Sequence, residues 1–346
     1  IALTHRWFIE LYTTSDHSIS ASSFSTLDYD LYIALLLGKL GRHRDKEGDF
    51  KNAIVLFQKG ISIIASYEDS PHSSEKLAEI RLWLWRSCGW SHMMLAEYEK
   101  AQEAIKKALV DAQKMERSID LCQIYRLAAA IAFYLGEQEA VENFAEMALK
   151  IATKAQDSRG QAEAYFTFGN LANLQGNYHD SLRFFNQAKD YFDNMQLMGA
   201  KGRCLNNLGV ASYLLGQWSE AIYYWEKFAV ICEKLGERTQ WVNALNNFAF
   251  LYKDRGSFQQ AKRSLEQALT IARKEGLERF EATLLGNLGE VLWRIGEVEN
   301  ARSALQEAQK KAIELGATGE AIENQRRLLA IDIDENTETN LEESLR

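Results

Sequence analysis

The chain has 346 residues, of which 47% are hydrophobic and 25% charged, and its formal net charge is −8 at pH 7. No apolar stretch approaches the roughly 20 residues that a membrane-spanning helix needs. The acidic balance also lacks the basic footprint of proteins that bind nucleic acids or anionic membranes, so we expect neither partner. The single proline, Pro71, argues against proline-rich linkers and against an all-β chain with many turns.

The cysteines and the first residues of the chain indicate where the protein is located and whether it belongs to a longer chain. The four cysteines form no CxxC pair and no dense framework, which indicates a reducing, cytoplasmic localisation. The chain starts at Ile1 with neither a methionine nor a signal peptide, so we expect it to be a piece of a longer protein. Flanking domains of that longer chain are therefore possible partners, and the oligomeric state stays open.

The first 30 residues form a segment of their own. Residues 1–12 read as a helix, and residues 13–26 follow as a loop rich in serine and threonine. We expect this loop to be a flexible connection, with a phosphorylatable segment as the alternative.

From residue 31 to residue 316 the sequence repeats itself with a period of 40 residues. One series holds small residues at what we expect to be a turn: Gly48, Ala96, Gly136, Gly176, Gly216, Gly256 and Gly296. A second series lies seven residues earlier: Gly41, Gly89, Ala129, Gly169, Gly209, Ala249 and Gly289. Two further series start at Ala53 and Gly60, and an excess of eight residues falls around Ser66–Ser74.

These series predict a helix, a short turn and a second helix in each repeat. Small residues in register let helices approach closely, and large apolar residues stand between them at helical spacing. Gly236, Gly276 and Gly316 lie where the second helix should end at a left-handed cap. One hairpin cannot bury both its faces, so we expect about seven of them to stack into a single solenoid.

The pattern of Gly209, Gly216, Ala221 and Phe228 resembles the tetratricopeptide repeat. The 40-residue length and the stretch Leu205–Gly209 (LNNLG) are similar to the repeats of Pins/LGN, of kinesin light chain and of MalT-like bacterial sensor regions. The resemblance implies an all-α, right-handed solenoid of antiparallel helix pairs over residues 31–316. We expect residues 317–331 to form a capping helix and residues 332–346 a flexible acidic tail.

No motif for catalysis or for a cofactor is found. The chain lacks GxxxxGK[ST], GxSxG, HExxH and GxGxxG patterns, so we predict no enzyme, no cofactor and no metal. Cys88 and His92 lie one helical turn apart and could share a metal ion, but both occupy core positions of their repeat. We therefore interpret them as packing residues.

The resemblance implies that the first helix of each repeat lines a concave groove. We number that helix so that the small residue (Gly209 and its equivalents) is slot eight, and slots two, five, six, nine and twelve then face inward. The predicted partner-binding residues in these slots are Trp83, Arg86, Trp90, Arg126, Phe166, Asn170, Arg203, Asn206, Asn207, Asn243, Asn246, Asn247, Phe250, Lys253, Asn287, Glu290 and Trp293.

The asparagines are the most informative members of this set. Asparagine is a poor helix former, so its repeated appearance in the middle of helices needs a reason. One reason is that the amides hold a peptide backbone, because each offers donors and an acceptor. The other is that they bond neighbouring helices and stiffen the stack, and both uses can coexist.

The remaining inward residues suggest the partner's chemistry. Aromatic side chains in the inward slots would anchor a partner, whereas Trp85, Trp218 and Trp225 fall in core slots. The inward arginines and Lys253 favour an acidic or carboxylate-bearing peptide. Chaperone binding through a carboxylate clamp is not favoured, because Ala130 follows Arg126 where that clamp needs asparagine.

Two functions remain. The first is a protein–protein interaction scaffold that binds a peptide segment of a partner along the groove. The alternative is a ligand- or peptide-sensing regulatory arm of a larger signalling ATPase, transcription regulator or enzyme.

Overall fold

The computed structural model describes residues 26–67, 75–115 and 118–345, with side chains as far as residue 334. Every element in these ranges is an α-helix. The predicted helix over 1–12 and nearly all of the loop over 13–26 lie outside the described residues. The chain divides into two compact units, residues 1–155 and 156–346.

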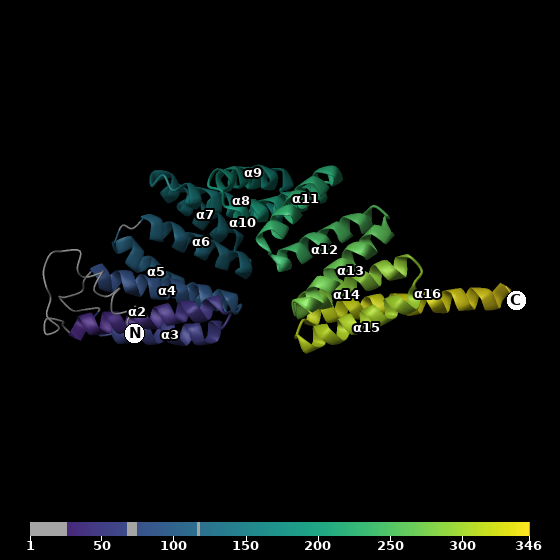
Figure 1. Cartoon of the computed structure of the whole chain (residues 1–346), viewed down its shortest axis with the longest axis horizontal. Helices are drawn as coiled ribbons and strands as arrows, with labels where there is room; N and C mark the ends of the chain where they lie inside the picture. The colour runs from purple at the N-terminus through teal and green to yellow at the C-terminus, as the bar shows by residue number, and fades with distance from the viewer. Residues whose placement is uncertain (1–25, 68–74, 116–117, 346) are drawn as a thin grey trace. The chain divides into compact units, whose positions relative to one another are not determined.

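The described residues of the first unit form three helical hairpins (Figure 1). Within each hairpin the two helices are joined by a short turn and pack along one another. The helices are α2 (Thr26–Lys46), α3 (Phe50–Ala65), α4 (Glu75–Met94), α5 (Tyr98–Lys114), α6 (Ser118–Leu135) and α7 (Gln138–Lys154). Among the connections that follow α2 in this unit, the one between α3 and α4 is the longest, so the excess of eight residues lies there, as predicted.

The second unit contains four hairpins and one final helix. The helices are α8 (Ser158–Leu174), α9 (Tyr178–Asn194), α10 (Met198–Leu214), α11 (Trp218–Leu235), α12 (Arg238–Asp254), α13 (Phe258–Lys274), α14 (Glu278–Arg294), α15 (Val298–Glu314) and α16 (Thr318–Leu345). Helix α16 continues through residues 332–345, which the sequence analysis assigned to a separate flexible tail.

The turn inside each hairpin explains the first glycine series. At Gly216 the backbone has φ 73°, and the amide of Gln217 donates to the carbonyl of Ser212 at 2.9 Å. This six-to-one bond ends the helix in a Schellman motif, which needs a left-handed residue. Gly236, Gly276 and Gly316 also have positive φ, which confirms the predicted caps between hairpins.

The second series explains how the two helices of a hairpin approach so closely. A Cβ atom on Gly169 would stand 2.7 Å from the Phe185 ring, and one on Gly209 would collide with Trp225. Gly289 lies equally tightly against Leu305. In each case a large side chain of the second helix occupies the space above a glycine of the first, so the series is a packing requirement.

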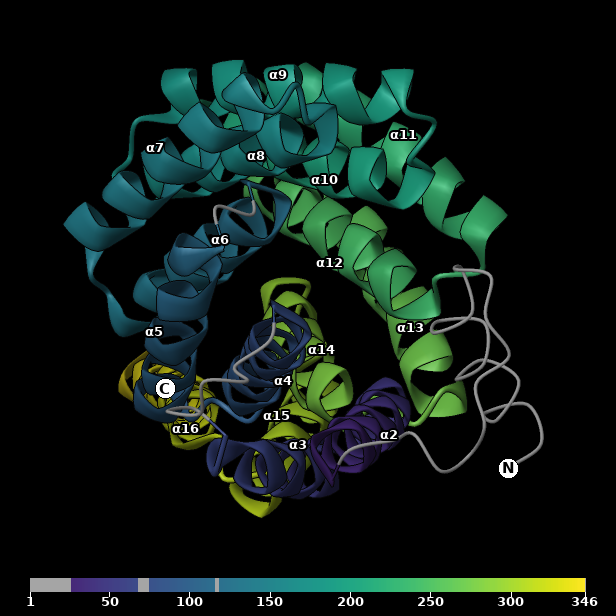
Figure 2. The ribbon, with the colours of Figure 1, turned by 90° about the vertical axis from the view of Figure 1, so that its left-hand side faces the viewer.

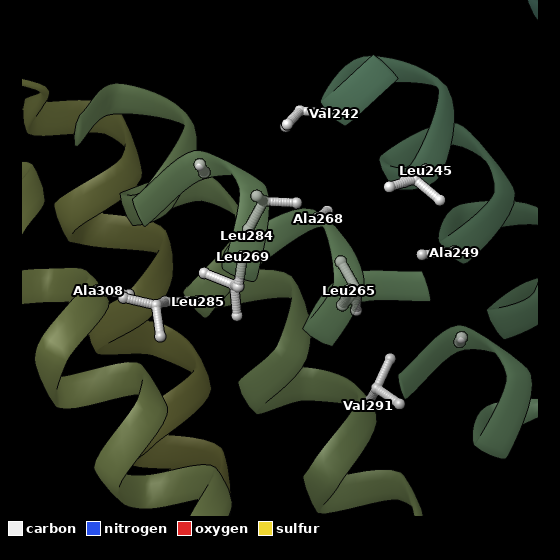
Figure 3. Packing of buried hydrophobic residues seen from close by; sticks show 12 residues of the cluster. Val242, Leu245, Ala249, Leu265, Ala268, Leu269, Leu284, Leu285, Val291 and Ala308 are labelled. Carbon is white, nitrogen blue, oxygen red and sulfur yellow. The ribbon is translucent and has the colours of Figure 1, made fainter. Parts of the chain in front are cut away.

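The core of the second unit runs continuously between successive helices. One cluster combines residues of α12, α13, α14 and α15, and Figure 3 shows them meeting between the ribbons. Val242, Leu245 and Ala249 of α12 follow helical spacing and belong to the same buried cluster as Leu265 of α13. Each hairpin thus covers the apolar face of the next, as the solenoid prediction requires.

Two contact patterns distinguish the faces of the second unit. Each first helix contacts the next first helix, α8 with α10, α10 with α12 and α12 with α14, whereas the second helices α9, α11, α13 and α15 do not contact one another. Elements on the inner side of a curved stack lie closer together. Figure 2 shows α8, α10, α12 and α14 on that inner side and α9, α11 and α13 outside.

The fold is therefore the predicted all-α solenoid of antiparallel helix pairs. Two details differ from the sequence analysis. Trp218 is 39% exposed because it is the first residue of α11, at the mouth of the turn, so its assignment to the core is wrong. Trp85 is only half-buried, whereas Trp225 is 1% exposed, as predicted.

Among the described helices, only α6 is long and apolar enough to cross a membrane by length and composition. Of its 18-residue window, 39% is buried inside the structure. Its residues Ile124, Leu127 and Ile131 pack against α5, which accounts for their apolar character. The absence of a membrane partner stays a prediction.

Candidate functional site: the inner face of the first helices

Thirteen of the predicted residues lie on the first helices of the second unit. Phe166 and Asn170 come from α8, Arg203, Asn206 and Asn207 from α10, and the others from α12 and α14. The last group consists of Asn243, Asn246, Asn247, Phe250, Lys253, Asn287, Glu290 and Trp293.

The asparagines form a ladder that joins α8 to α10, α10 to α12 and α12 to α14. The side-chain Nδ2 of Asn207 donates to Oδ1 of Asn170 at 3.1 Å. Asn247 donates in the same way to Asn206 at 2.9 Å, and Asn287 donates to Asn246 at 3.0 Å. Slot six therefore always supplies the donor, and the amide of the preceding first helix supplies the acceptor.

In the ladder, each of these asparagines uses only one of its two side-chain groups, either the carbonyl oxygen or the NH₂ group. Asn206 and Asn246 accept through Oδ1 and keep their NH₂ groups, whereas Asn247 and Asn287 donate through Nδ2 and keep their carbonyl oxygens. Among the described residues, these remaining groups have no hydrogen-bond partner. All four side chains are half-buried, so they are held in place yet not sealed from solvent. The inner face thus presents fixed donors and acceptors on α10, α12 and α14.

A small pocket marks the centre of this surface. Asn246 and Asn287 line it together with Phe250, Lys253 and Val291. Its volume of about 10 Å³ admits one group the size of a water molecule. The pocket is a local recess between α12 and α14 and is too small to hold a folded ligand by itself.

Arg327 of α16 ends the ladder, although it is not among the residues predicted from the sequence. Its Nη1 donates to the backbone carbonyl of Gly286 at 2.9 Å, and its Nη2 pairs with Glu290 at 3.1 Å. The signal was present, because Arg327 lies 40 residues after Asn287 and so occupies slot six of the last helix. The capping helix is thus held by the same register that joins the repeats.

The basic residues of this face are paired with acidic neighbours. Lys253 lies 3.0 Å from Glu290, which therefore bridges α12, α14 and α16 through Lys253 and Arg327. Arg203 lies 3.6 Å from Glu163 and stands over the Phe166 ring at 5.0 Å. The cationic spots that favoured an acidic peptide are thus neutralised by side chains of adjacent repeats.

The aromatic residues of the inner face are supported by neighbours. Phe166 packs edge-on against Phe185 with ring centroids 5.4 Å apart. Lys253 covers Phe250 at 5.3 Å, and Arg294 covers Trp293 at 5.4 Å. These rings are half-buried, so each offers a partner one edge or face while its other side packs within the solenoid.

A second pair on this face also escaped the sequence analysis. The hydroxyl of Tyr213, in slot twelve of α10, donates to the carboxylate of Asp254 at the end of α12. Burial and this hydrogen bond raise the pKa of Tyr213 to about 12, so the hydroxyl stays protonated at neutral pH. The pair ties α10 to α12 alongside the asparagine ladder.

The other four predicted residues belong to the first unit. Trp83, Arg86 and Trp90 lie on α4, and Arg126 lies on α6. Trp83 packs directly over Gly38 of α2, whereas Trp90 is 42% exposed. Arg86 donates to Asp120 at 2.8 Å. Burial lowers the pKa of Arg86, and the Asp120 carboxylate partly opposes that effect.

Cys88 and His92 lie in the core, as predicted, with 1% and 6% of their surfaces exposed. Nδ1 of His92 lies 2.6 Å from a carboxylate oxygen of Glu97. Burial raises the pKa of the Cys88 thiol to about 12, so this side chain is a neutral thiol at pH 7. Within the described ranges, no group of three potential metal ligands occurs.

Comparisons with known proteins agree with this architecture. The family model for the tetratricopeptide repeat matches residues 201–274 and 242–314. Comparison with curated protein sequences found no match.

Several solved structures share the fold. The apo form of RapI has a TM-score of 0.63 at 12% identity, covering 81% of this chain and 99% of its own. A Rap protein complexed with Competence and Sporulation Factor has a TM-score of 0.57 at 16% identity, covering 96% and 92%. A signal-transduction ATPase (STAND) protein with a tetratricopeptide repeat sensor, from Pyrococcus horikoshii, has a TM-score of 0.62 at 17% identity, covering 93% and 49%.

Sequence and fold lead to the same assignment. The residues matched by the family model include the turn at Gly216, the glycine contacts of Gly209 and Gly289 and two of the three rungs of the asparagine ladder. The earlier described hairpins have the same helix–turn–helix form. Residues 201–314 are therefore tetratricopeptide repeats, and the fold of the described residues is an all-α solenoid of helical hairpins.

Proposed function

We propose that the protein binds an extended peptide segment of a partner along the inner face of α8, α10, α12 and α14. The observation that carries this proposal is the asparagine ladder with its unused amide groups. A peptide backbone presents alternating N–H and C=O groups, and fixed amides can satisfy both. First helices in contact are about 10 Å apart, so one rung serves roughly three residues of an extended peptide at about 3.3 Å each.

The comparisons give this proposal independent support. A Rap protein of the same fold was crystallised with Competence and Sporulation Factor, and that solenoid covers most of the present chain. We infer a binding role. Burial raises the pKa values of the Cys88 and Cys204 thiols to about 12. Neither thiol is a nucleophile at neutral pH.

The test replaces the unused NH₂ groups of two asparagines and keeps the hydrogen bonds of the ladder. In Asn206→Asp and Asn246→Asp, one carboxylate oxygen still accepts the bonds from Asn247 and Asn287, whereas the free NH₂ group becomes an anionic oxygen. We expect the double variant to lose at least about tenfold in affinity for peptides selected from a display library on the wild-type protein. Fluorescence anisotropy of the labelled peptides measures the affinity.

The control for this experiment is Glu226→Gln on α11, which changes one exposed charge on the outer helix. It should bind the selected peptides as the wild-type protein does. Thermal melting of the Asp variants shows whether the ladder survives. Unchanged affinity in a folded double variant would rule out the inner face of these helices as the binding surface.

The alternative function is the regulatory sensing arm of a larger signalling protein. It is favoured by the STAND protein, whose fold matches 93% of this chain, whereas the match covers 49% of that longer protein. In this case a selected peptide would change the curvature of the solenoid as well as bind to it. Small-angle scattering with and without the peptide measures such a change. Invariant dimensions at saturating peptide would count against the sensor function and leave the scaffold function standing.

A further inference from the structure

The first unit has a pocket that the inner face does not use. It has a volume of about 490 Å³, within the range of roughly 300–1,000 Å³ typical of ligand sites, and opens between α3 and α5. Trp85, Cys88 and His92 line it from one stripe of α4. These residues occupy slots four, seven and eleven, whereas the inner face consists of slots two, five, six, nine and twelve.

The pocket exists because one aromatic side chain is missing from a series. In the next repeat Phe144 of α7 packs against Tyr125 in slot four, with ring centroids 6.1 Å apart. In the repeat after that, Phe184 stacks on Tyr165 at 6.4 Å. The residue 40 positions before Phe144 is Ala104, so the Trp85 ring has no such partner. The last two hairpins also have small residues there, but their slot four holds a buried leucine.

On its pocket side the indole is covered by a weakly held cation. The ammonium group of Lys107 stands over the Trp85 ring at 4.4 Å and pairs with Glu103 at 2.8 Å. Both members of that pair are exposed, with 46% and 69% of their side chains accessible. An exposed ion pair of this kind contributes little, so an incoming ring can displace Lys107 from the indole.

The charges at the rim favour an anion. Lys100 pairs with Glu97 at 3.0 Å, and Lys107 pairs with Glu103, which leaves Lys51 of α3 without an acidic partner among the described residues. The lining therefore carries three lysines against two carboxylates. The surplus cation lies at the edge of a pocket whose floor is aromatic.

We propose that this pocket binds a planar aromatic ring that carries an anionic group, with the ring on Trp85 and the anion at Lys51. The ring takes the position that Phe144 and Phe184 occupy in the following repeats. This chemistry has two sources, a small aromatic carboxylic acid or an aromatic side chain beside an acidic residue in a peptide. The site is independent of the peptide surface proposed for the second unit.

Fluorine NMR tests the proposal with three probes: 4-fluorophenylacetate, its neutral amide, and the peptide acetyl-(4-fluoro)Phe-Glu-amide. We expect line broadening of one or both anionic probes on the wild-type protein. Ala104→Phe, which restores the missing ring, should weaken this binding at least about tenfold because the space is filled. Ser264→Phe makes the matched change on α13 and should leave binding unchanged.

Two further variants keep the test decisive if Ala104→Phe does not fold. Trp85→Leu places in slot four the residue found at Leu205, Leu245 and Leu285, and should remove binding of every probe. Lys51→Gln should weaken the anionic probes about threefold to tenfold at low salt and leave the amide unaffected. Binding of the acid alone, or of the peptide alone, identifies the source. No binding of either anionic probe, or equal binding to folded Ala104→Phe or Trp85→Leu, would overturn the proposal.

Discussion

At the scale of single residues, backbone conformation explains where glycine recurs and where its absence has a cost. The left-handed turn residue is glycine at most junctions, but Ala96, Gln156 and Gln196 also have positive φ, between 53° and 58°. A side chain with a Cβ atom is strained in this region by about 1 kcal/mol. The turns at these three positions are therefore less stable than the turns that contain glycine.

This strain leads to a pair of opposite predictions. Gln196→Gly should raise the free energy of unfolding by about 0.5 kcal/mol, because strain is removed while the unfolded chain gains freedom. Gly216→Ala should lower it by about 1 kcal/mol, since it introduces the same strain. Urea unfolding followed by circular dichroism measures both. A stabilising effect of Gly216→Ala would contradict this account of the turns.

At the scale of helices, hydrogen bonds between asparagine side chains of successive repeats make the apolar packing more specific. Each rung of the ladder joins residues 37 or 41 positions apart, one repeat from the next. A buried apolar face alone tolerates small rotations of one helix against another. The hydrogen bonds between asparagine side chains fix this rotation. This explains why asparagine recurs in the middle of helices despite its poor helix propensity.

Removing a rung should therefore cost stability. Asn247→Ala deletes the donor to Asn206, and we expect a loss of about 1 kcal/mol relative to Asn243→Ala on the same helix. The comparison is needed because alanine gains helix propensity in both variants. Equal unfolding midpoints for the two variants would show that the ladder contributes nothing to stability.

At the scale of the whole molecule, a solenoid is stabilised by contacts between neighbouring repeats, so damage should stay local. The four buried cysteines report on this, two in each unit. Burial raises the pKa of Cys88 and Cys204 to about 12 and that of Cys232 to about 11, above the ordinary value of 9.0. At pH 8 the folded protein therefore holds neutral, inaccessible thiols that react only after local opening.

Gly209→Ala forces a Cβ atom into the Trp225 ring, and Gly89→Ala forces one to within 2.8 Å of Ile105. We expect Gly209→Ala to raise the labelling rate of Cys204 and Cys232 at pH 8 by at least about tenfold, with little change at Cys88. Gly89→Ala should have the opposite pattern. Mass spectrometry of alkylated peptides measures each site, and uniform acceleration at all four cysteines would contradict local opening.

The thiols also make stability depend on pH in a defined direction. Their pKa values are raised in the folded state, so their contribution is complete below about pH 9. It is lost as the pH rises toward 11 or 12, because the unfolded chain then releases protons that the folded chain retains. The labelling experiment at pH 8 lies below this range and so compares proteins of full stability.

The sequence by itself determined the helical hairpins, their left-handed turns and the close approach of helices over glycine. These features depend on backbone conformation and side-chain size at fixed positions within one repeat, and the period of 40 residues displays them directly. The same register numbers the slots that are predicted to face inward, and extending it by one repeat assigns slot six to Arg327.

Only the tertiary structure decided what those inward side chains do. Whether an asparagine is free or bonded, whether Lys253 is an open cation or the partner of Glu290, and whether Trp85 is covered all depend on side chains 19 to 41 positions away on adjacent helices. Such pairings depend on distance and orientation between helices. A linear pattern records which residues share a face but not which of their atoms meet.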